Sequence, residues 1–177
     1  MALSKKSLAT VATIGSLLVL ILAAVILWDY RLNKRVQAYQ LITEGNPSDE
    51  QLLNFLKSND QIILENTLRL LEHRKVLAGR EPGIKLLTNP DLYIWYPASL
   101  YLGALGDQRS VPYLIRGLDH PAWRSRPRVV AYLKVLTGQD FGERKQDWIS
   151  WWSAKQPQSA FDFTCVKPPQ VAAPSHQ

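Results

Sequence analysis

The sequence has very few cysteines and histidines, the residues on which most metal and thiol chemistry depends. Cys165 is the only cysteine among 177 residues, and the three histidines, at 73, 120 and 176, are far apart. An internal disulfide and a thiolate metal cluster are therefore excluded, and we expect no metal site. Cys165 is interpreted as a spectator, with a covalent link to a partner as the alternative. His120 precedes Pro121 and is interpreted as a turn or helix-cap residue.

The motifs of common catalytic sites are also missing. The nine glycines form no phosphate-binding loop after a strand, and no Gly-x-Ser-x-Gly motif occurs. Adjacent carboxylates such as Asp49 and Glu50 would point apart on a helix, so they do not form a catalytic pair. We therefore expect a protein that is not an enzyme and that carries no cofactor.

Positive charge is in only slight excess. The formal net charge is +6, from 21 lysines and arginines against 15 acidic residues, and the basic residues are scattered. Such a mild excess is compatible with anionic lipid, an acidic partner or nucleic acid, and it selects none of them. Once an anchor and a tail are set aside, roughly 110 residues remain, which is enough for one modest core.

One long segment, from Leu8 to Trp28, contains no charged residue. As a helix it would be ~31 Å long, which matches a hydrocarbon core of about 30 Å. Residues suited to a membrane interface, Trp28, Tyr30 and Arg31, lie at its C-terminal end. The sequence therefore predicts a tail and a transmembrane helix over residues 1–30. A cleaved secretory signal is the alternative, although its apolar stretch would be only ~7–15 residues.

The flanking charges give a weak indication of orientation. Lys5, Lys6 and the α-amine on one side nearly balance Arg31, Lys34 and Arg35 on the other. A short Lys-Lys segment before a long apolar run resembles an uncleaved signal anchor. We therefore expect a single-pass protein of a bacterial inner membrane, with its remaining residues on the extracytoplasmic side.

Helical periodicity continues beyond the apolar segment. The apolar residues there recur at spacings of 4, 3 and 3: Leu32, Val36, Tyr39 and Ile42. Gly45, Asn46 and Pro47 then end the pattern. Residues 31–45 are therefore expected to form a juxtamembrane helix or stalk, and not a flexible linker.

The rest of the chain repeats with a period of 31 residues. Four apolar columns follow this period: Leu53/Ile84/Ile115, Leu56/Leu87/Leu118, Leu70/Tyr101/Tyr132 and Leu71/Leu102/Leu133. A turn column, Asn59/Pro90/Pro121, has the same spacing. Each period reads as a short and a longer helix, and no alternating pattern predicts a strand. Since such a pair cannot bury its apolar face alone, we predict an all-α solenoid over residues 46–156, with about three helix pairs and a capping helix.

Signals for helix ends fit the same repeat. Ser48 and Gln51 have the spacing of a capping box. Pro97 and Pro127, in or near the start of a longer helix, predict kinks or late starts. Three glycines lie where a helix end favours a left-handed residue: Gly79, Gly106 and Gly138.

A family resemblance is carried by residues 102–121, which read Leu-Gly-Ala-Leu-Gly-Asp-Gln-Arg-Ser-Val-Pro-Tyr-Leu-Ile-Arg-Gly-Leu-Asp-His-Pro. This stretch resembles a HEAT-type repeat of the bacterial kind also found in phycobilin-lyase-like proteins, and the resemblance continues through Arg128 to Gly138. The specific part is a Leu-Gly-Asp-x-Arg turn followed by Val-Pro-x-Leu-Ile. Two positions depart from the family: Gly83 replaces an apolar residue, and 124–128 read Arg-Ser-Arg-Pro-Arg. The resemblance implies an α-solenoid used for protein–protein contact, usually without catalysis.

A cluster of tryptophans follows the last repeat. Trp148, Trp151 and Trp152 lie at i, i+3 and i+4 in a helix predicted over residues 143–155. A helix that caps the last repeat is the first interpretation, because a terminal repeat has no further neighbour. An aromatic surface that binds a partner is the alternative, since three adjacent tryptophans can hardly all turn inward.

The C-terminal residues, 157–177, are rich in proline and read as an extended tail. Phe161 and Phe163 form a short apolar hook within this tail. A disordered tail with a loosely packed hook is one interpretation, and a peptide arm laid on a neighbouring subunit is the other.

One basic cluster offers a second candidate partner site: Trp123, Arg124, Arg126 and Arg128. Arginines beside an aromatic ring can bind phosphate or a carboxylate-rich partner. The alternative is structural, because the family resemblance implies that Arg109 pairs across repeats with an acid such as Asp107 or Asp119. Residues 93–96 (Tyr-Ile-Trp-Tyr) are interpreted as core, with partner contact as the alternative.

Together these features favour a non-catalytic, membrane-anchored scaffold or accessory subunit of a membrane protein complex. Its partners would be other protein subunits and the lipid bilayer, and nucleic acid is not expected. Two alternatives stay open. One is a module that binds an anionic polymer or lipid through the arginine cluster, and the other is a cofactor chaperone like the bilin lyases.

Overall fold

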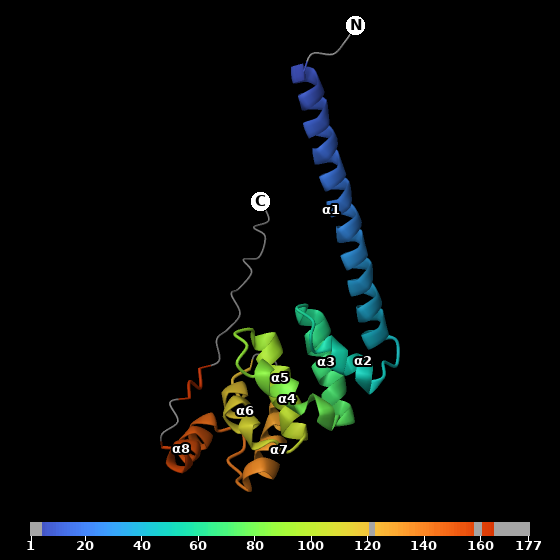
Figure 1. Ribbon diagram of the computed structural model, residues 1–177. Coiled ribbons are helices and arrows are strands. Elements are labelled where there is room, and N and C mark those ends of the chain that lie inside the picture. Colours follow the sequence, from blue (N-terminus) through green and yellow to red (C-terminus); the bar gives the residue numbers. More distant parts are fainter. Residues whose placement is uncertain (1–4, 121–122, 158–160, 165–177) are drawn as a thin grey trace, which may run out of the picture. The chain divides into compact units, whose positions relative to one another are not determined.

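The computed structural model describes residues 5–120, 123–157 and 161–164. These residues form eight α-helices and three short 3-10 helices, with no strand among them (Figure 1). The predicted all-α class is therefore confirmed. The chain divides into two compact units, Met1–Gly45 and Asn46–Gln177.

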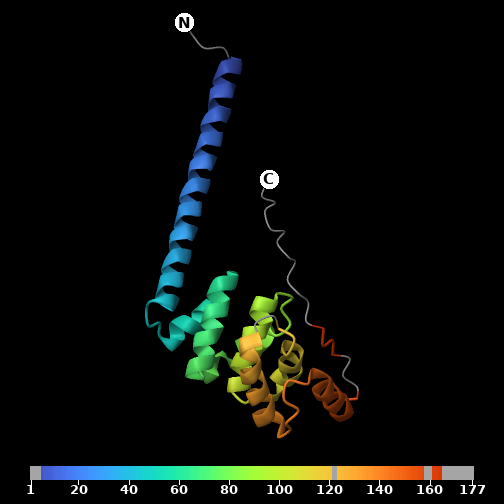
Figure 2. The same cartoon turned by 180° about the vertical axis from the view of Figure 1, so that it is seen from behind.

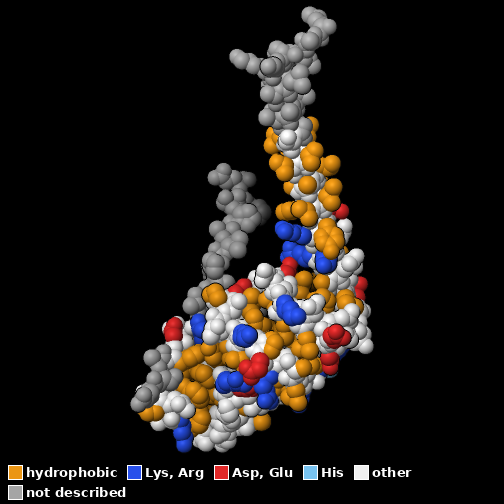
Figure 3. Space-filling view, viewed as in Figure 1, with side chains coloured by type: hydrophobic (Ala, Val, Ile, Leu, Met, Phe, Trp, Pro, Cys, Tyr) orange, Lys and Arg blue, Asp and Glu red, His pale blue; other side chains and the backbone are white. Residues whose placement is uncertain are grey.

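The first unit is one unbroken helix, α1 (Lys5–Thr43), of 39 residues. Its segment Ser16–Thr43 is long and apolar enough to cross a membrane. The apolar side chains described there are exposed, and Figure 3 shows them as a band followed by lysine and arginine side chains. Since no protein covers this surface, the helix suits either a membrane anchor or a signal sequence.

The residues predicted for the membrane interface lie on α1 directly after this band. Trp28 is 74% exposed and Tyr30 is 58% exposed. The Lys34 ammonium lies 5.3 Å from the centroid of the Tyr30 ring, and Arg31 is exposed beside it. No break separates these residues from the apolar band, so residues 31–43 continue the same helix.

The second unit repeats with the predicted period. The short helices α2 (Asp49–Phe55), α4 (Arg80–Leu86) and α6 (Val111–Gly117) begin and end 31 residues apart. The longer helices α3 (Gln61–Arg74) and α5 (Leu92–Ala104) begin at the same interval. The third longer helix, α7 (Arg126–Thr137), begins late, after the 3-10 turn η3 (Trp123–Ser125), as Pro127 predicted. By contrast, α5 begins five residues before Pro97, so no late start occurs there.

The helices pack as successive pairs. Helix α2 contacts α3, α4 contacts α5, and α6 contacts α7, while α5 also contacts the longer helices of both neighbouring pairs. Figures 1 and 2 show the same order from opposite sides. The last helix, α8 (Lys145–Lys155), packs on α6. The column Leu71, Leu102 and Leu133 has no exposed surface, so the repeated leucines form the core.

Three of the predicted helix-end signals are confirmed. Ser48 Oγ accepts a hydrogen bond from Gln51 N at 3.2 Å, and Gln51 Oε1 accepts one from Ser48 N at 2.8 Å, which completes a capping box. Gly106 and Gly138 have φ angles of 76° and 71°, the left-handed conformation expected of them.

The expectation for Gly79 is wrong. Its φ angle is −84°, and Lys75, with φ of 54°, takes the left-handed position at the end of α3. Gly79 is instead required by a close approach, since a Cβ atom there would lie 2.5 Å from Tyr101 Oη. A Cβ atom at Gly83 would lie 3.0 Å from Tyr101 Cε1, which explains why this repeat lacks an apolar side chain at position 83. Tyr101 is fully buried, and burial raises the pKa of its hydroxyl to about 12.

Candidate functional site

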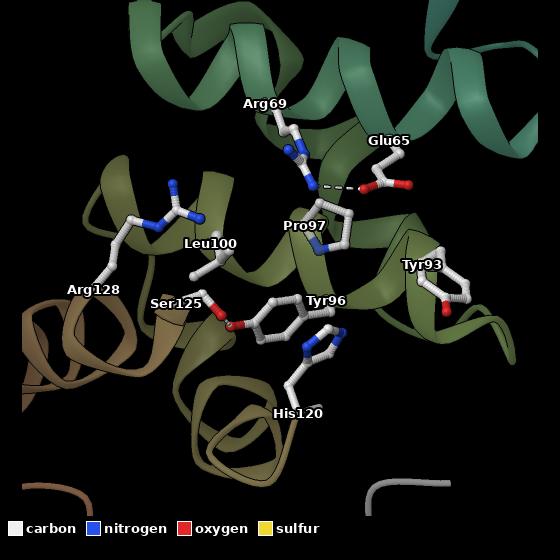
Figure 4. Close-up of a pocket in the computed structure, with 9 residues that line it drawn as sticks. All are labelled: Glu65, Arg69, Tyr93, Tyr96, Pro97, Leu100, His120, Ser125 and Arg128. Carbon is white, nitrogen blue, oxygen red and sulfur yellow. Dashed lines mark hydrogen bonds and ion pairs between the residues drawn. The ribbon is translucent and has the colours of Figure 1, made fainter. Parts of the chain in front are cut away.

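A pocket of about 170 Å³ lies on the face built by the longer helices (Figure 4). Helix α3 contributes Glu65 and Arg69, α5 contributes four residues, and α7 contributes Arg128. The remaining lining residues come from the segment between α6 and α7. The full lining is Glu65, Arg69, Tyr93, Tyr96, Pro97, Leu100, His120, Ser125 and Arg128. Three consecutive helix pairs therefore build this site together.

A stacked pair of rings forms one wall of the pocket. Tyr96 and His120 lie with ring centroids 4.0 Å apart and an interplanar angle of 13°. The Tyr96 hydroxyl is hydrogen-bonded to Ser125 Oγ at 2.6 Å, and Trp95 packs edge-on against the Tyr96 ring. Gly117 allows this packing, because a Cβ atom there would lie 2.6 Å from Tyr96 Cε2. The wall is thus held by contacts from α5, α6 and η3.

The stacked wall carries no charge at neutral pH. Tyr96 is 6% exposed and His120 is 8% exposed. Burial lowers the pKa of His120 from its ordinary value near 6.5, because it disfavours the imidazolium. A neutral imidazole stacked on a phenol ring presents an aromatic surface to a ligand, with Pro97 and Leu100 as apolar neighbours (Figure 4).

Two arginines lie at the rim of the pocket. Arg69 Nη2 is 2.7 Å from Glu65 Oε1, and the Arg69 side chain is 65% exposed. Arg128 Nη1 is 3.3 Å from Glu72 Oε1, and its side chain is 48% exposed. Figure 4 shows Arg69 of α3 over Pro97, and Arg128 of α7 extending toward Leu100. Both guanidinium groups therefore have an acidic partner and still meet solvent at the pocket.

A buried carboxylate, that of Glu72, links the first and third helix pairs. The Glu72 side chain is 6% exposed, and its Oε1 atom accepts a hydrogen bond from Tyr132 Oη at 2.8 Å. Burial, with the carboxylate beside it, raises the pKa of the Tyr132 hydroxyl well above its usual range. Because Glu72 is on α3 and Tyr132 is on α7, this hydrogen bond fixes the distance between two of the helices that line the pocket.

This arrangement suits recognition. The wall offers aromatic and apolar surface, and the rim offers guanidinium donors in fixed positions. Among the described residues, no group of three histidine, cysteine, aspartate or glutamate side chains is placed to hold a metal ion. Ser125 Oγ is hydrogen-bonded to Tyr96, and the His120 ring stacks on that same tyrosine.

The predicted arginine cluster reaches this pocket only in part. Arg128 lines it, whereas Arg126 Nη1 lies 3.9 Å from Glu143 Oε2. Arg124 is exposed and does not line the pocket, and the Trp123 side chain lies outside the described part of the chain. The three arginines therefore do not converge on one ligand position.

The predicted tryptophan cluster is mostly buried against the core of the second unit. Trp148 has no exposed surface, and its Nε1 atom donates a hydrogen bond to Gly142 O at 2.8 Å. Trp151 and Trp152 are partly buried and pack against the same core. Trp148 therefore offers a partner no surface, and the part of this cluster that meets solvent is limited to Trp151 and Trp152.

The predicted hook, residues 161–163, packs on its own chain. The Phe161 ring packs edge-on against Tyr113 at a centroid distance of 4.8 Å, and Phe163 packs on the core beside α8. These contacts agree with the hook of the first interpretation, whereas an arm laid on a neighbouring subunit stays a prediction. Residues 158–160 and 165–177, including Cys165, lie outside the described residues.

Arg109 pairs across repeats as expected, but its partner there is Glu81, whereas its contact with Asp107 lies within one turn. Arg109 Nη2 lies 2.8 Å from Asp107 Oδ2 and 3.1 Å from Glu81 Oε1, so it links two successive helix pairs. Asp119, the other acid considered, pairs with Lys145 instead. These contacts lie between helix pairs and bring no ligand group into the pocket.

The sequence predicted only part of the pocket. Residues 93–96 were predicted to be core, and Ile94, Trp95 and Tyr96 are buried. Tyr93, however, is 40% exposed and lines the pocket with Tyr96. Glu65 and Arg69 were not considered, because nothing in their spacing distinguishes them from an ordinary solvated i,i+4 pair. His120 lies in a turn as expected, and its stacking on Tyr96 had no signal in the sequence.

Comparison of this chain with protein-family models, with curated proteins and with solved structures found no match, so the assignment of function rests on the residues and geometry described above.

Proposed function

We propose that this protein is a non-catalytic, membrane-anchored scaffold or accessory subunit, and that it holds a partner protein against the face carrying the pocket. The observation that carries the proposal is the joint construction of this pocket by three consecutive helix pairs. A site assembled in this way presents a continuous surface across the repeats, as helical repeat proteins do when they bind other proteins.

The fold behind this proposal is a short HEAT-like solenoid. It is supported by the short helices, which recur at intervals of 31 residues, and by the longer helices, which pack in the order α3, α5, α7. The cross-repeat contacts of Glu72 with Tyr132 and of Arg109 with Glu81 also support it. Helix α8 would then be the terminal cap, with Trp148 closing the end of the core.

The anchor in this proposal is α1, retained in the membrane and not cleaved. The continuous helix through Thr43 supports retention, because a cleaved signal has an apolar stretch of only ~7–15 residues. We propose the extracytoplasmic side for the second unit, on the basis of the short Lys-Lys segment before the span.

The ion pairs of the arginines favour a protein partner over an anionic polymer. Arg69, Arg126 and Arg128 each have a carboxylate within 4 Å, so most of their charge is already balanced. Binding of nucleic acid or anionic lipid depends on unbalanced cations that displace counterions. The aromatic and apolar wall of the pocket, in contrast, matches the anchoring positions of protein interfaces.

The test compares two exposed positions in the full chain. Tyr93 lines the pocket and is 40% exposed, whereas Val135 is on α7, is 80% exposed and does not line the pocket. Tyr93→Arg and Val135→Arg should both fold, because neither buries the new charge. Each variant and the wild type would be tagged, purified from native membranes in mild detergent, and compared by quantitative mass spectrometry.

We expect a stoichiometric partner with the wild type and with Val135→Arg, and an at least tenfold loss of that partner with Tyr93→Arg. Equal recovery with both variants would place the interface elsewhere. A wild-type chain that is always recovered as a free monomer would contradict the scaffold proposal itself.

A further inference from the structure

A second surface, distinct from the pocket, already holds a peptide segment. Phe161 packs edge-on against Tyr113 of α6 at a centroid distance of 4.8 Å. Phe161 and Phe163 also pack against each other at 4.9 Å, and both are half-buried. The two rings therefore form one apolar contact with the last helix pair and its cap.

Two cations of this surface bind the backbone of the same segment. Arg116 Nε donates a hydrogen bond to Thr164 O at 2.7 Å, and Lys145 Nζ donates one to Phe163 O at 2.7 Å. These acceptors are main-chain carbonyl groups, so the two cations bind the backbone of the segment and not its side chains. Such charge-assisted hydrogen bonds are stronger than neutral ones.

Both cations are held in place by contacts that do not involve the segment. The Arg116 guanidinium lies 4.7 Å from the centroid of the buried Trp95 ring. Lys145 forms an ion pair with Asp119. Donors fixed in this way need little ordering when a peptide arrives, which favours binding.

The segment forms a turn of its own, which directs both phenylalanines toward the helices that they pack on. Asp162 Oδ1 accepts hydrogen bonds from Thr164 N at 2.8 Å and from Thr164 Oγ1 at 2.7 Å. These hydrogen bonds hold the pKa of the Asp162 carboxyl below its usual value. The Asp162 side chain itself is exposed, so the central position of the motif faces solvent.

We propose that the surface formed by Tyr113, Arg116 and Lys145 is a binding site for a Phe-x-Phe peptide segment. Residues 161–163 occupy this site within the chain, and a partner protein that carries an exposed Phe-x-Phe segment competes for it. The requirement for two phenylalanines follows from the ring contacts, and Asp162, whose side chain is exposed, acts through the turn that it forms with Thr164.

The intramolecular segment should shield the site from external peptides. A tethered ligand has an effective concentration in the millimolar range, so an added peptide binds the wild type weakly. Phe161→Ala with Phe163→Ala removes both rings of the tethered segment and should open the site. Residues Tyr113, Arg116 and Lys145 are unchanged in this double variant.

The experiment measures the binding of a labelled peptide to the full chain in detergent. The probe is fluorescein-labelled Ser-Ala-Phe-Asp-Phe-Thr-Ser-Val, and its control has alanine in place of both phenylalanines. We expect fluorescence anisotropy to give at least tenfold tighter binding to the double variant than to the wild type, and no binding of the control peptide. Adding Lys145→Ala to the double variant should weaken binding about tenfold, whereas Lys155→Ala, an exposed lysine on the same helix, should not change it.

Equal binding to the wild type and to the double variant would overturn the proposal, as would binding that is insensitive to Lys145→Ala. Circular dichroism shows whether the double variant is folded. If it is not, Phe161→Ala alone replaces it, because Phe163 then keeps its contact with the core. The site lies on α6 and α8, so this result is independent of whether Tyr93→Arg releases a partner from the pocket.

Discussion

Gly117 sets how closely α6 approaches the stacked wall of the pocket. A Cβ atom at this position would lie 2.6 Å from Tyr96 Cε2 and 2.9 Å from Tyr96 Cδ2. The Tyr96 ring cannot move away easily, because His120 stacks on it and Ser125 holds its hydroxyl. Gly106 differs, since a Cβ atom there would meet nothing within 4 Å and only its φ of 76° disfavours a side chain. The two glycines are thus retained for different physical reasons.

This difference predicts different effects of alanine at the two positions. Gly117→Ala should lower the free energy of unfolding by about 1–3 kcal/mol, through overpacking against Tyr96. Gly106→Ala should lower it by roughly 1–2 kcal/mol, through backbone strain. Only Gly117→Ala should also change the near-ultraviolet circular dichroism of the tyrosines and reduce recovery of the partner proposed to bind at the pocket. Thermal melting of the full chain in detergent gives the stability. An unchanged aromatic spectrum in Gly117→Ala would contradict the close packing.

At the scale of elements, one buried carboxylate organises the turn between α5 and α6. Asp107 caps the 3-10 turn η2 (Gln108–Ser110) by accepting a hydrogen bond from Arg109 N at 3.0 Å. It also accepts hydrogen bonds from the Arg109 side chain and lies 3.7 Å from Arg80 Nε. Its side chain is only 6% exposed, and Arg109 continues to Glu81 of the preceding pair. The turn and the junction between two pairs therefore depend on the same acid.

We predict that Asp107→Asn lowers the free energy of unfolding by about 1–2 kcal/mol, because hydrogen bonds to charged groups are lost while an amide oxygen still accepts one. The hydrogen bonds from Arg109 hold the pKa of Asp107 below its usual value near 3.9. The carboxylate therefore contributes full stability above about pH 4, and the contribution is lost as pH falls through the lower folded pKa. Melting temperatures at pH 7 and at pH 3 should differ less in Asp107→Asn than in the wild type.

The matched control for this prediction is Asp49→Asn. Asp49 pairs with Arg74 at 3.2 Å, but its side chain is 58% exposed, and exposed ion pairs contribute about 0–1 kcal/mol. A loss in Asp49→Asn as large as that in Asp107→Asn would show that burial is not the cause.

On the scale of the whole molecule, two units with different requirements share one chain. The described apolar side chains of α1 are exposed, as a bilayer-spanning helix requires, whereas the second unit has its own core. In Figure 3, charged side chains of both signs gather on the visible face of the second unit, among hydrophobic ones. A unit with its own core and a mixed surface is expected to fold without α1.

Residues 46–177 expressed alone should therefore give a helical, cooperatively melting protein in buffer without detergent. The intact chain should require detergent or lipid, because about 25 cal/mol per Å² opposes exposure of its apolar helix to water. Circular dichroism and size-exclusion chromatography check both statements. Recovery of the intact chain as a monomer in plain buffer would contradict the membrane anchor, and a strand-rich or unfolded spectrum from residues 46–177 would contradict the repeat fold.

Local pattern was sufficient for the helical class, the long apolar helix and the Ser48 cap, because each depends on residues close together in the chain. The same holds for Gly106 and Gly138, which closely follow Ala104 and Thr137, the last residues of their helices. The 31-residue period was visible because similar residues recur at that interval. Local pattern failed at Gly79, where the deciding contact comes from Tyr101 on another helix.

The pocket and the Phe161 surface came from packing between helices. Arg128 meets Glu72, and Phe161 meets Tyr113, only because the helix pairs stack in one order. Contacts over such separations leave no periodic trace in a single chain, since either partner alone looks like an ordinary surface residue. The repeat therefore follows from the order of the amino acids, whereas the composition of the sites follows from how close the stacked helices bring distant side chains.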